Sequence, residues 1–97
     1  MKPVRSDWQG AILICRKCSK KVGGGFGDGG KLSLAKLLKR GMGLGRKRKS
    51  RVGVVEVGCL DICPKRAVTV VDTRRPGAWQ VVPAGMSLGE VAERLEL

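Results

Sequence analysis

The chain has 97 residues, of which 20 are Lys or Arg and 8 are Asp or Glu, giving a net charge of +12. Only three residues are aromatic and none is histidine. This composition excludes a histidine-ligated metal site within these residues. It predicts one domain spanning residues 1–97 with an aliphatic core, in which a metal site would use cysteine thiolates, with or without carboxylates.

The apolar runs are too short for export or for membrane insertion. The run from Ala11 to Ile14 is shorter than a secretory apolar region and far shorter than the ~20 residues that span a bilayer. We therefore expect a cytoplasmic protein without membrane contact. In that compartment, paired cysteines more often bind metal or carry out redox chemistry than form structural disulfides.

The first half of the chain predicts a strand, a loop and a helix. Residues 11–15 (AILIC) are typical of a short strand buried on both faces, and the glycine-rich segment 16–31 is expected to be a loop. Ser33 is a suitable N-cap for a helix over residues 34–40. Gly41 stands where a glycine commonly ends a helix.

The second half predicts three strands and a closing helix. A flexible basic loop over residues 41–51 leads to a valine-rich strand at 52–57, which should run parallel to the first strand. A strand at 67–71 and its antiparallel hairpin partner at 78–82 follow, and then a helix opened by a capping box over 87–95. The sequence thus predicts an α/β protein with the order β-α-β-(turn)-β-β-α and a mixed four-stranded sheet.

Four cysteines occur as two pairs, each directly after a predicted strand. Cys15 and Cys18 form a CxxC pattern, and Cys59 and Cys63 form a CxxxC pattern. Because the carboxyl ends of neighbouring parallel strands meet at one edge of a sheet, we expect the four sulfurs at a single site. Four thiolates suit either zinc or a [2Fe–2S] cluster.

A redox dithiol formed by Cys15 and Cys18 is a third interpretation. In thioredoxin-type enzymes a helix begins at the CxxC motif, and its N-terminus lowers the pKa of a thiol. Here a glycine-rich loop is expected between the motif and the helix that follows Ser33. The second cysteine pair would also have no role. Metal binding is therefore favoured over a dithiol oxidoreductase.

The segment GCLDICPKRAVTVVDTRRPGAWQVV, residues 58–82, is similar to the C-terminal half of the thioredoxin-like [2Fe–2S] ferredoxins. In that family a strand ends in GCxxxC and is followed by a short helical turn, a further strand with a hairpin and a closing helix. The resemblance extends over residues 10–97. It implies a thioredoxin-like fold and a one-electron carrier, not an enzyme, with one [2Fe–2S] cluster on Cys15, Cys18, Cys59 and Cys63. The first two ligands stand further apart in the family, so zinc remains the alternative cofactor.

Positive charge is concentrated in the first half of the chain. Residues 1–51 hold fifteen Lys and Arg against two acids, with a dense run at RKRKSR (46–51). Such a field attracts acidic proteins and nucleic acid alike. The run contains no aromatic residue for base stacking, so an acidic redox partner protein is the favoured partner. The alternative function is a zinc-stabilised basic nucleic-acid-binding module, and the family's dimers imply a homodimer.

The glycine-rich segment also matches phosphate-binding patterns. Gly25-x-Gly27-x-x-Gly30 satisfies a dinucleotide fingerprint, and Gly30-Lys31 resembles the end of a phosphate loop. However, the fingerprint does not directly follow the predicted strand, and Leu32 occupies the place of the Ser or Thr that would hold magnesium. We therefore do not expect this segment to bind nucleotide phosphates.

Overall fold

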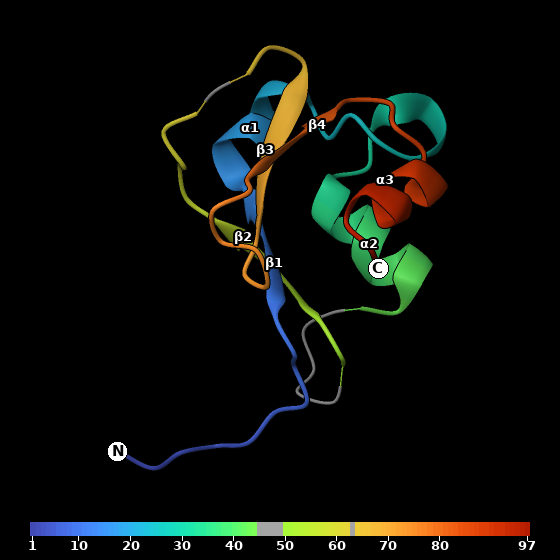
Figure 1. The fold of residues 1–97 in the computed structure, drawn as a ribbon. Helices are drawn as coiled ribbons and strands as arrows, with labels where there is room; N and C mark the ends of the chain where they lie inside the picture. Colours follow the sequence, from blue (N-terminus) through green and yellow to red (C-terminus); the bar gives the residue numbers. More distant parts are fainter. Residues whose placement is uncertain (45–49, 63) are drawn as a thin grey trace.

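Four strands form one mixed sheet in the computed structural model, which describes residues 1–44, 50–62 and 64–97 (Figure 1). The spatial order is β2-β1-β3-β4, and the strands are β1 (Ala11–Cys15), β2 (Gly53–Val57), β3 (Ala67–Asp72) and β4 (Gln80–Pro83). β1 runs parallel to β2, whereas β3 is antiparallel to both β1 and β4. The prediction of an α/β protein with a mixed four-stranded sheet is confirmed.

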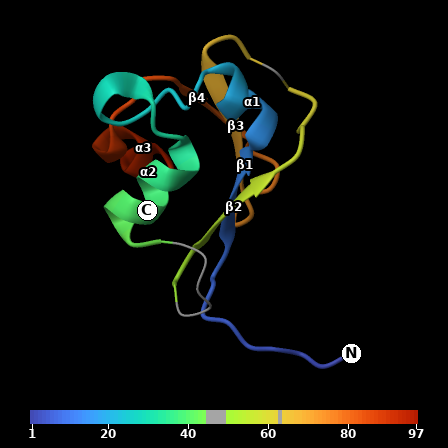
Figure 2. The ribbon, with the colours of Figure 1, turned by 180° about the vertical axis from the view of Figure 1, so that it is seen from behind.

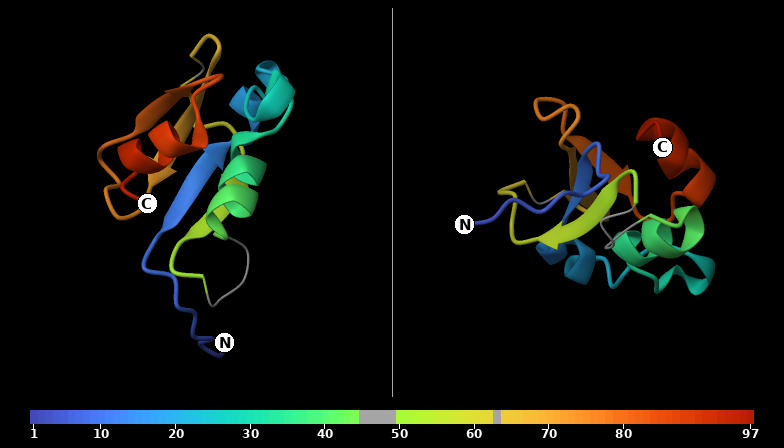
Figure 3. Two further views of the ribbon diagram at one scale, coloured as in Figure 1. Left: turned by 90° about the vertical axis from the view of Figure 1, so that its right-hand side faces the viewer. Right: turned by 90° about the horizontal axis from the view of Figure 1, so that it is seen from below.

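Three α-helices accompany the sheet: α1 (Arg16–Lys21), α2 (Leu34–Met42) and α3 (Leu88–Arg94). Helices α2 and α3 lie side by side on one face of the sheet, as the views from front and back show (Figures 1 and 2). Helix α1 stands at the end of the sheet where β1 finishes (Figure 3). No helix in the described parts of the chain is long and apolar enough to cross a membrane.

The prediction of a loop over residues 16–31 is wrong at its start, because α1 begins directly after Cys15. The sulfur of Cys15 caps this helix by accepting a hydrogen bond from the backbone N–H of Cys18, with 3.5 Å between Sγ and N. The hydroxyl of Ser19 donates to the Cys15 carbonyl oxygen at 3.0 Å. Two lysines in the last turn suit the negative end of the helix dipole. Local sequence patterns miss this helix because its cap is a sulfur atom.

The remainder of the glycine-rich segment is built around Phe26. This ring is fully buried, and the backbone of Phe26 exchanges two hydrogen bonds of 2.9 Å with that of Leu32. A short 3₁₀ helix, Asp28–Gly30, forms the bend between them. At Gly24 the backbone has φ +90°, and a side chain there would collide with the carbonyl group of Lys31. The segment therefore anchors itself in the core with its single aromatic ring.

Helix α2 begins as predicted and ends later than predicted. Ser33 is its N-cap and accepts a hydrogen bond from the N–H of Lys36, with 3.3 Å between O and N. Gly41, predicted to terminate the helix, lies inside it. A side chain at Gly41 would collide with Leu88, so this glycine allows α2 and α3 to approach each other closely. The left-handed C-cap is Gly43, with φ +63°.

The predicted basic loop at 41–51 is described only in part. Its first two residues belong to α2, and residues 45–49, which include most of the RKRKSR run, lie outside the described residues. Arg51 is exposed, and its carbonyl oxygen accepts a hydrogen bond of 2.8 Å from Gln9 just before β1. Arg51, at the end of this segment, therefore lies at the end of the sheet where β1 and β2 begin.

The predicted elements of the C-terminal half are confirmed within two residues at each boundary. Strand β4 returns antiparallel to β3, and Ser87 caps α3 by accepting a hydrogen bond of 3.2 Å from the N–H of Glu90. Both signals are local, since a Pro-Gly turn and a Ser-x-x-Glu cap act within a few residues of chain.

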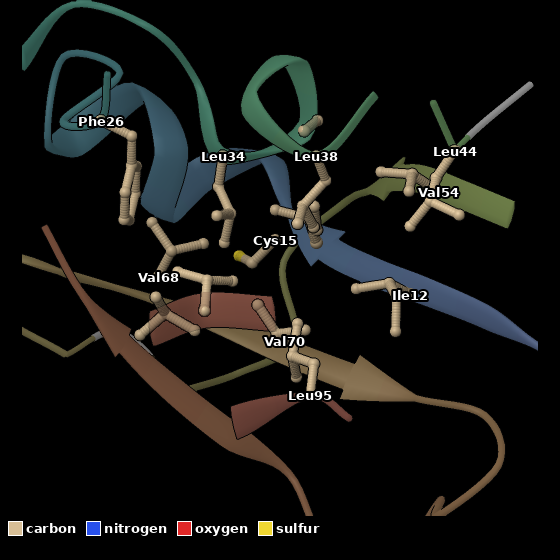
Figure 4. Packing of buried hydrophobic residues seen from close by; sticks show 14 of the residues in the cluster. Ile12, Cys15, Phe26, Leu34, Leu38, Leu44, Val54, Val68, Val70 and Leu95 are labelled. Carbon is tan, nitrogen blue, oxygen red and sulfur yellow. The ribbon is translucent and has the colours of Figure 1, made fainter. Parts of the chain in front are cut away.

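The hydrophobic core lies between the sheet and the pair α2 and α3 (Figure 4). Strand β3 is buried along its whole length, and each fully buried aliphatic side chain stabilises the fold by about 1.5–3 kcal/mol. The inner face of the sheet and the two helices contribute Ile12, Ile14, Val68, Val70, Leu34, Leu38, Val91 and Leu95. This packing holds the carboxyl ends of β1 and β2 side by side.

Candidate cysteine site

The two cysteine-bearing segments meet at the end of the sheet where β1 and β2 finish, which we call the cysteine end. The register pairs Cys15 with Val57, so the residues after Val57 leave the sheet beside the start of α1. The carbonyl oxygen of Ile62 then accepts a hydrogen bond from Cys18 Sγ at 3.5 Å. It also accepts one from Thr69 Oγ1 at 3.1 Å. These contacts hold the second segment against the CxxC motif and against β3.

Cys15 and Cys18 form a buried pair of free thiols. Their residues are 0% and 1% exposed, respectively. Figure 4 shows Cys15 among core side chains that include Leu34, at the point where β1 passes into α1. The CxxC motif is therefore part of the hydrophobic core.

The two buried thiols differ in pKa. Burial raises the pKa of Cys15, but hydrogen bonds to its sulfur outweigh burial and bring the pKa below its usual value. The donors are the backbone N–H groups of Cys18, Leu60 and Lys17 and the thiol of Cys18. The pKa of Cys18 is raised, first by burial and then by the neighbouring Cys15, while hydrogen bonds from Thr69 act in the opposite direction. The thiolate form is therefore easier to reach at Cys15 than at Cys18.

Cys59 lies at the surface of the cysteine end. Its side chain is exposed, and its sulfur accepts a hydrogen bond from the N–H of Asp61, with 3.3 Å between Sγ and N. The left-handed backbone of Asp61, with φ +63°, turns the chain back towards Ile62. Cys63 lies outside the described residues. Among the residues that are described, no group of three or more His, Cys, Asp or Glu side chains is arranged to hold a metal ion.

Thr69 and Ser19 support the site but were not singled out by any sequence motif. Thr69 is fully buried in β3 and fixes the Ile62 carbonyl group, while Ser19 fixes the Cys15 carbonyl group. One signal was available in the sequence. A single threonine in the otherwise aliphatic run AVTVV has to find a hydrogen-bond partner if the strand is buried on both faces.

Cations outnumber acids at the cysteine end, where Asp61 is the acidic residue of the second cysteine segment. The exposed cations on α1 and on the turn before β3 are Arg16, Lys17, Lys20, Lys21, Lys65 and Arg66. Within the described residues, ion pairs with carboxylates are formed only by Arg74 and Arg75 at the opposite end of the sheet. The cations near the thiols therefore have no carboxylate partner in the described chain.

Buried thiols, backbone N–H donors and surrounding cations together suit ligands that carry negative charge on sulfur. Thiolates are soft ligands and select zinc, copper(I) or iron–sulfur clusters, and hydrogen bonds from N–H groups stabilise the bound sulfur. Comparison of the chain with protein-family models, with characterised proteins and with solved structures found no match in any of the three.

Proposed function

We propose that the protein is a one-electron carrier that holds a single [2Fe–2S] cluster on Cys15, Cys18, Cys59 and Cys63. The main support is the hydrogen bond from Cys18 Sγ to the carbonyl oxygen of Ile62, because Ile62 directly precedes Cys63. This bond joins Cys18 to a residue 44 positions further along the sequence and so holds the segment that begins at Cys59 beside the CxxC motif.

The strand pairing supports a thioredoxin-like ferredoxin fold. A parallel β1–β2 unit with its crossover helix, an antiparallel β3–β4 hairpin and a closing helix follow one another in the order that the family resemblance implies. We place the carrier in the cytoplasm, where thiols such as the free Cys15, Cys18 and Cys59 stay reduced.

The donor set fits such a cluster in its chemistry. Four cysteine thiolates are the usual ligands of a [2Fe–2S] centre, which when bound accepts and releases one electron. The N–H groups directed at Cys15 and Cys59 stabilise negative charge on sulfur, as do the surrounding cations. Both effects favour the more negative, reduced form and therefore raise the reduction potential. Of the three cysteines that the structure describes, Cys59 is the exposed one, so it would lie nearest to a docked partner.

A dithiol oxidoreductase is the second candidate, because α1 begins at the CxxC motif. The sequence argument against it assumed a loop at this place, and that assumption is wrong. The lowered pKa of Cys15 and the raised pKa of Cys18 also resemble the division of roles in a redox dithiol. However, an attacking thiol must be accessible to its substrate, and Cys15 is 0% exposed. A cluster ligand needs no such access, so the carrier is the preferred function.

Anaerobic purification followed by metal analysis and visible spectroscopy tests the proposal. The expected result is a reddish-brown protein with about two irons and two acid-labile sulfides per chain. Its visible absorbance should bleach on addition of dithionite. A colourless protein with one zinc per chain would contradict the carrier and favour the zinc alternative. A metal-free protein that cycles between a Cys15–Cys18 dithiol and a disulfide would favour the oxidoreductase.

A further inference from the structure

A hollow with basic walls opens beside the second cysteine segment. It has a volume of about 650 Å³ and is lined by Lys21, Val22, Pro64, Lys65, Arg66 and Ala84. Its charged lining residues are all cations, and the other three are apolar. The hollow joins the end of α1 to the turn before β3, so it borders the cysteine end directly.

A second hollow also borders α1. Its volume is about 450 Å³, and four of its lining residues are cations: Arg16, Lys20, Lys31 and Lys36. Glu56 is its one acidic lining residue, and the described structure contains no ion pair between Glu56 and these cations. Helix α1 therefore contributes positive charge to both hollows.

The seven cations of the two hollows repel one another and have no carboxylate partner within the described residues. An anionic surface bound there would relieve this repulsion and gain attraction at short range. The apolar walls of the first hollow suit a ligand whose charged groups are carried on hydrocarbon, such as Asp and Glu side chains.

An exposed apolar side chain lies near this basic surface. Ile62 is 45% exposed and is held by its carbonyl group beside Cys18, and Cys59 is exposed in the same segment. An apolar centre with a charged rim is typical of protein–protein interfaces. The interfaces of electron-transfer complexes bury little surface, and charge guides the association of the two proteins. The cysteine end combines these features in one place.

Nucleic acid fits this surface less well than protein does. Sequence-tolerant binding of single strands uses exposed aromatic rings on which the bases stack. Phe26 is fully buried, Trp8 packs against Gly53 at the start of β2, and Trp79 follows the β3–β4 turn. Both tryptophans thus lie at the opposite end of the sheet. No aromatic ring of the chain is available beside the basic hollows.

We propose that the basic hollows around α1 form the docking surface for a carboxylate-rich face of the protein that exchanges electrons with this chain. This inference rests on the proposed function and specifies where the partner binds. Lys21, Lys65 and Arg66 form its part nearest to the second cysteine segment. Docking there would bring the partner to Cys59 and Ile62, and the positive field would speed association at low ionic strength.

The test compares two triple variants with the same loss of charge. Lys21→Gln/Lys65→Gln/Arg66→Gln removes the cations of the first hollow. The control, Lys2→Gln/Arg5→Gln/Arg51→Gln, removes three exposed cations at the opposite end of the sheet. Circular dichroism and thermal unfolding establish that both variants fold.

The first measurement is binding of a fluorescein-labelled peptide rich in Asp and Glu, followed by anisotropy at low salt. We expect the hollow variant to lose about tenfold in affinity and the control variant to stay within about twofold of the original protein. Equal losses in the two variants would overturn the proposal, because net charge alone would then explain binding. An RNA oligomer that binds more tightly than the peptide and depends on the same three residues would overturn it as well.

The second measurement is stopped-flow oxidation of the dithionite-reduced protein. One electron passes from the reduced carrier to the iron(III) of hexacyanoferrate(III), an anion, and yields iron(II) with no proton transferred. The hollow variant should react about threefold to tenfold more slowly with this anion and faster with the cation hexaamminecobalt(III). Unchanged rates with both oxidants would contradict the proposal, because the charge of the first hollow would then have no effect on electron transfer. If the protein holds no redox centre, the proposed function fails, while peptide binding still decides whether the surface exists.

Discussion

The hydroxyl of Thr69 donates a hydrogen bond to the carbonyl oxygen of Ile62, with 3.1 Å between the two oxygens. Thr69 belongs to the fully buried strand β3, whereas Ile62 lies in the exposed segment that carries the second cysteine pair. The same carbonyl oxygen accepts a bond from the thiol of Cys18. One acceptor therefore connects a rigid strand, the CxxC motif and the outer cysteine segment.

Replacing Thr69 by valine should loosen this connection. Thr69→Val keeps the shape of the side chain and removes the donor, which should destabilise the protein by about 1–2 kcal/mol in urea unfolding. The proposed cluster should also be lost faster on exposure to air, because the segment that carries Cys59 is held less firmly. Thr69→Ser retains the hydroxyl group and should restore the rate of cluster loss. A valine variant as stable and as long-lived as the original would show that this hydrogen bond is unimportant.

Cys18 is the most informative of the four proposed ligands to remove. Cys18→Ala should yield protein with much less than half of the original iron, measured after anaerobic purification, because the cluster then has only three thiolates. Cys59→Ala should behave in the same way. Full iron content and an unchanged visible spectrum in Cys18→Ala would mean that another group supplies the fourth ligand.

The ionisation of Asp72 should make the stability of the fold depend on pH in the acidic range. Burial raises the pKa of Asp72, but hydrogen bonds and charge from Arg74, and charge from Arg75, outweigh it and hold the pKa below its usual value. The ionised carboxylate therefore contributes stability at neutral pH, and this contribution is lost as pH falls below about 4 towards the folded-state pKa. Tm measured from pH 7 to pH 3 should fall less steeply in Asp72→Asn than in the original protein.

The carboxylate of Asp72 should also stabilise the fold at neutral pH. The guanidinium of Arg74 donates three hydrogen bonds to the Asp72 carboxylate and a further bond of 2.8 Å to the carbonyl oxygen of Leu95 at the end of α3. Asp72→Asn should cost about 1–3 kcal/mol of unfolding free energy at pH 7, because it weakens a buried charge-assisted network. An unchanged unfolding free energy at pH 7 would contradict this role.

Two glycines in the helices provide a matched pair. Gly41→Ala in α2 should lower stability by up to about 2 kcal/mol in urea unfolding, since displacing the Leu88 side chain costs more than the ~1 kcal/mol that helix propensity contributes. Gly89→Ala in α3 meets nothing within 4 Å and should raise stability by about 0.5–1 kcal/mol through helix propensity. If both substitutions stabilise the protein, α2 and α3 are not packed as closely as described.

Elements with local signals could be predicted from the sequence alone. The strands appear as aliphatic runs, and Ser33 and Ser87 act as helix caps within four residues of chain. The helix α1 could not be predicted in this way. Its single apolar residue is Cys18, its cap is the sulfur of Cys15, and its position depends on packing against β3. Helices of this length are stabilised by tertiary contacts more than by propensity.

The sequence by itself determined that four thiols follow two strands in pairs and that positive charge dominates the first half of the chain. The tertiary structure decided how these groups are exposed. It buries Cys15 and Cys18 in the core and leaves Cys59 at the surface, because Thr69 holds the second segment across the end of the sheet. It also gathers cations distant in sequence around α1, since the chain returns to the cysteine end before β3. Burial and convergence of charge depend on contacts between distant residues, which no local pattern contains.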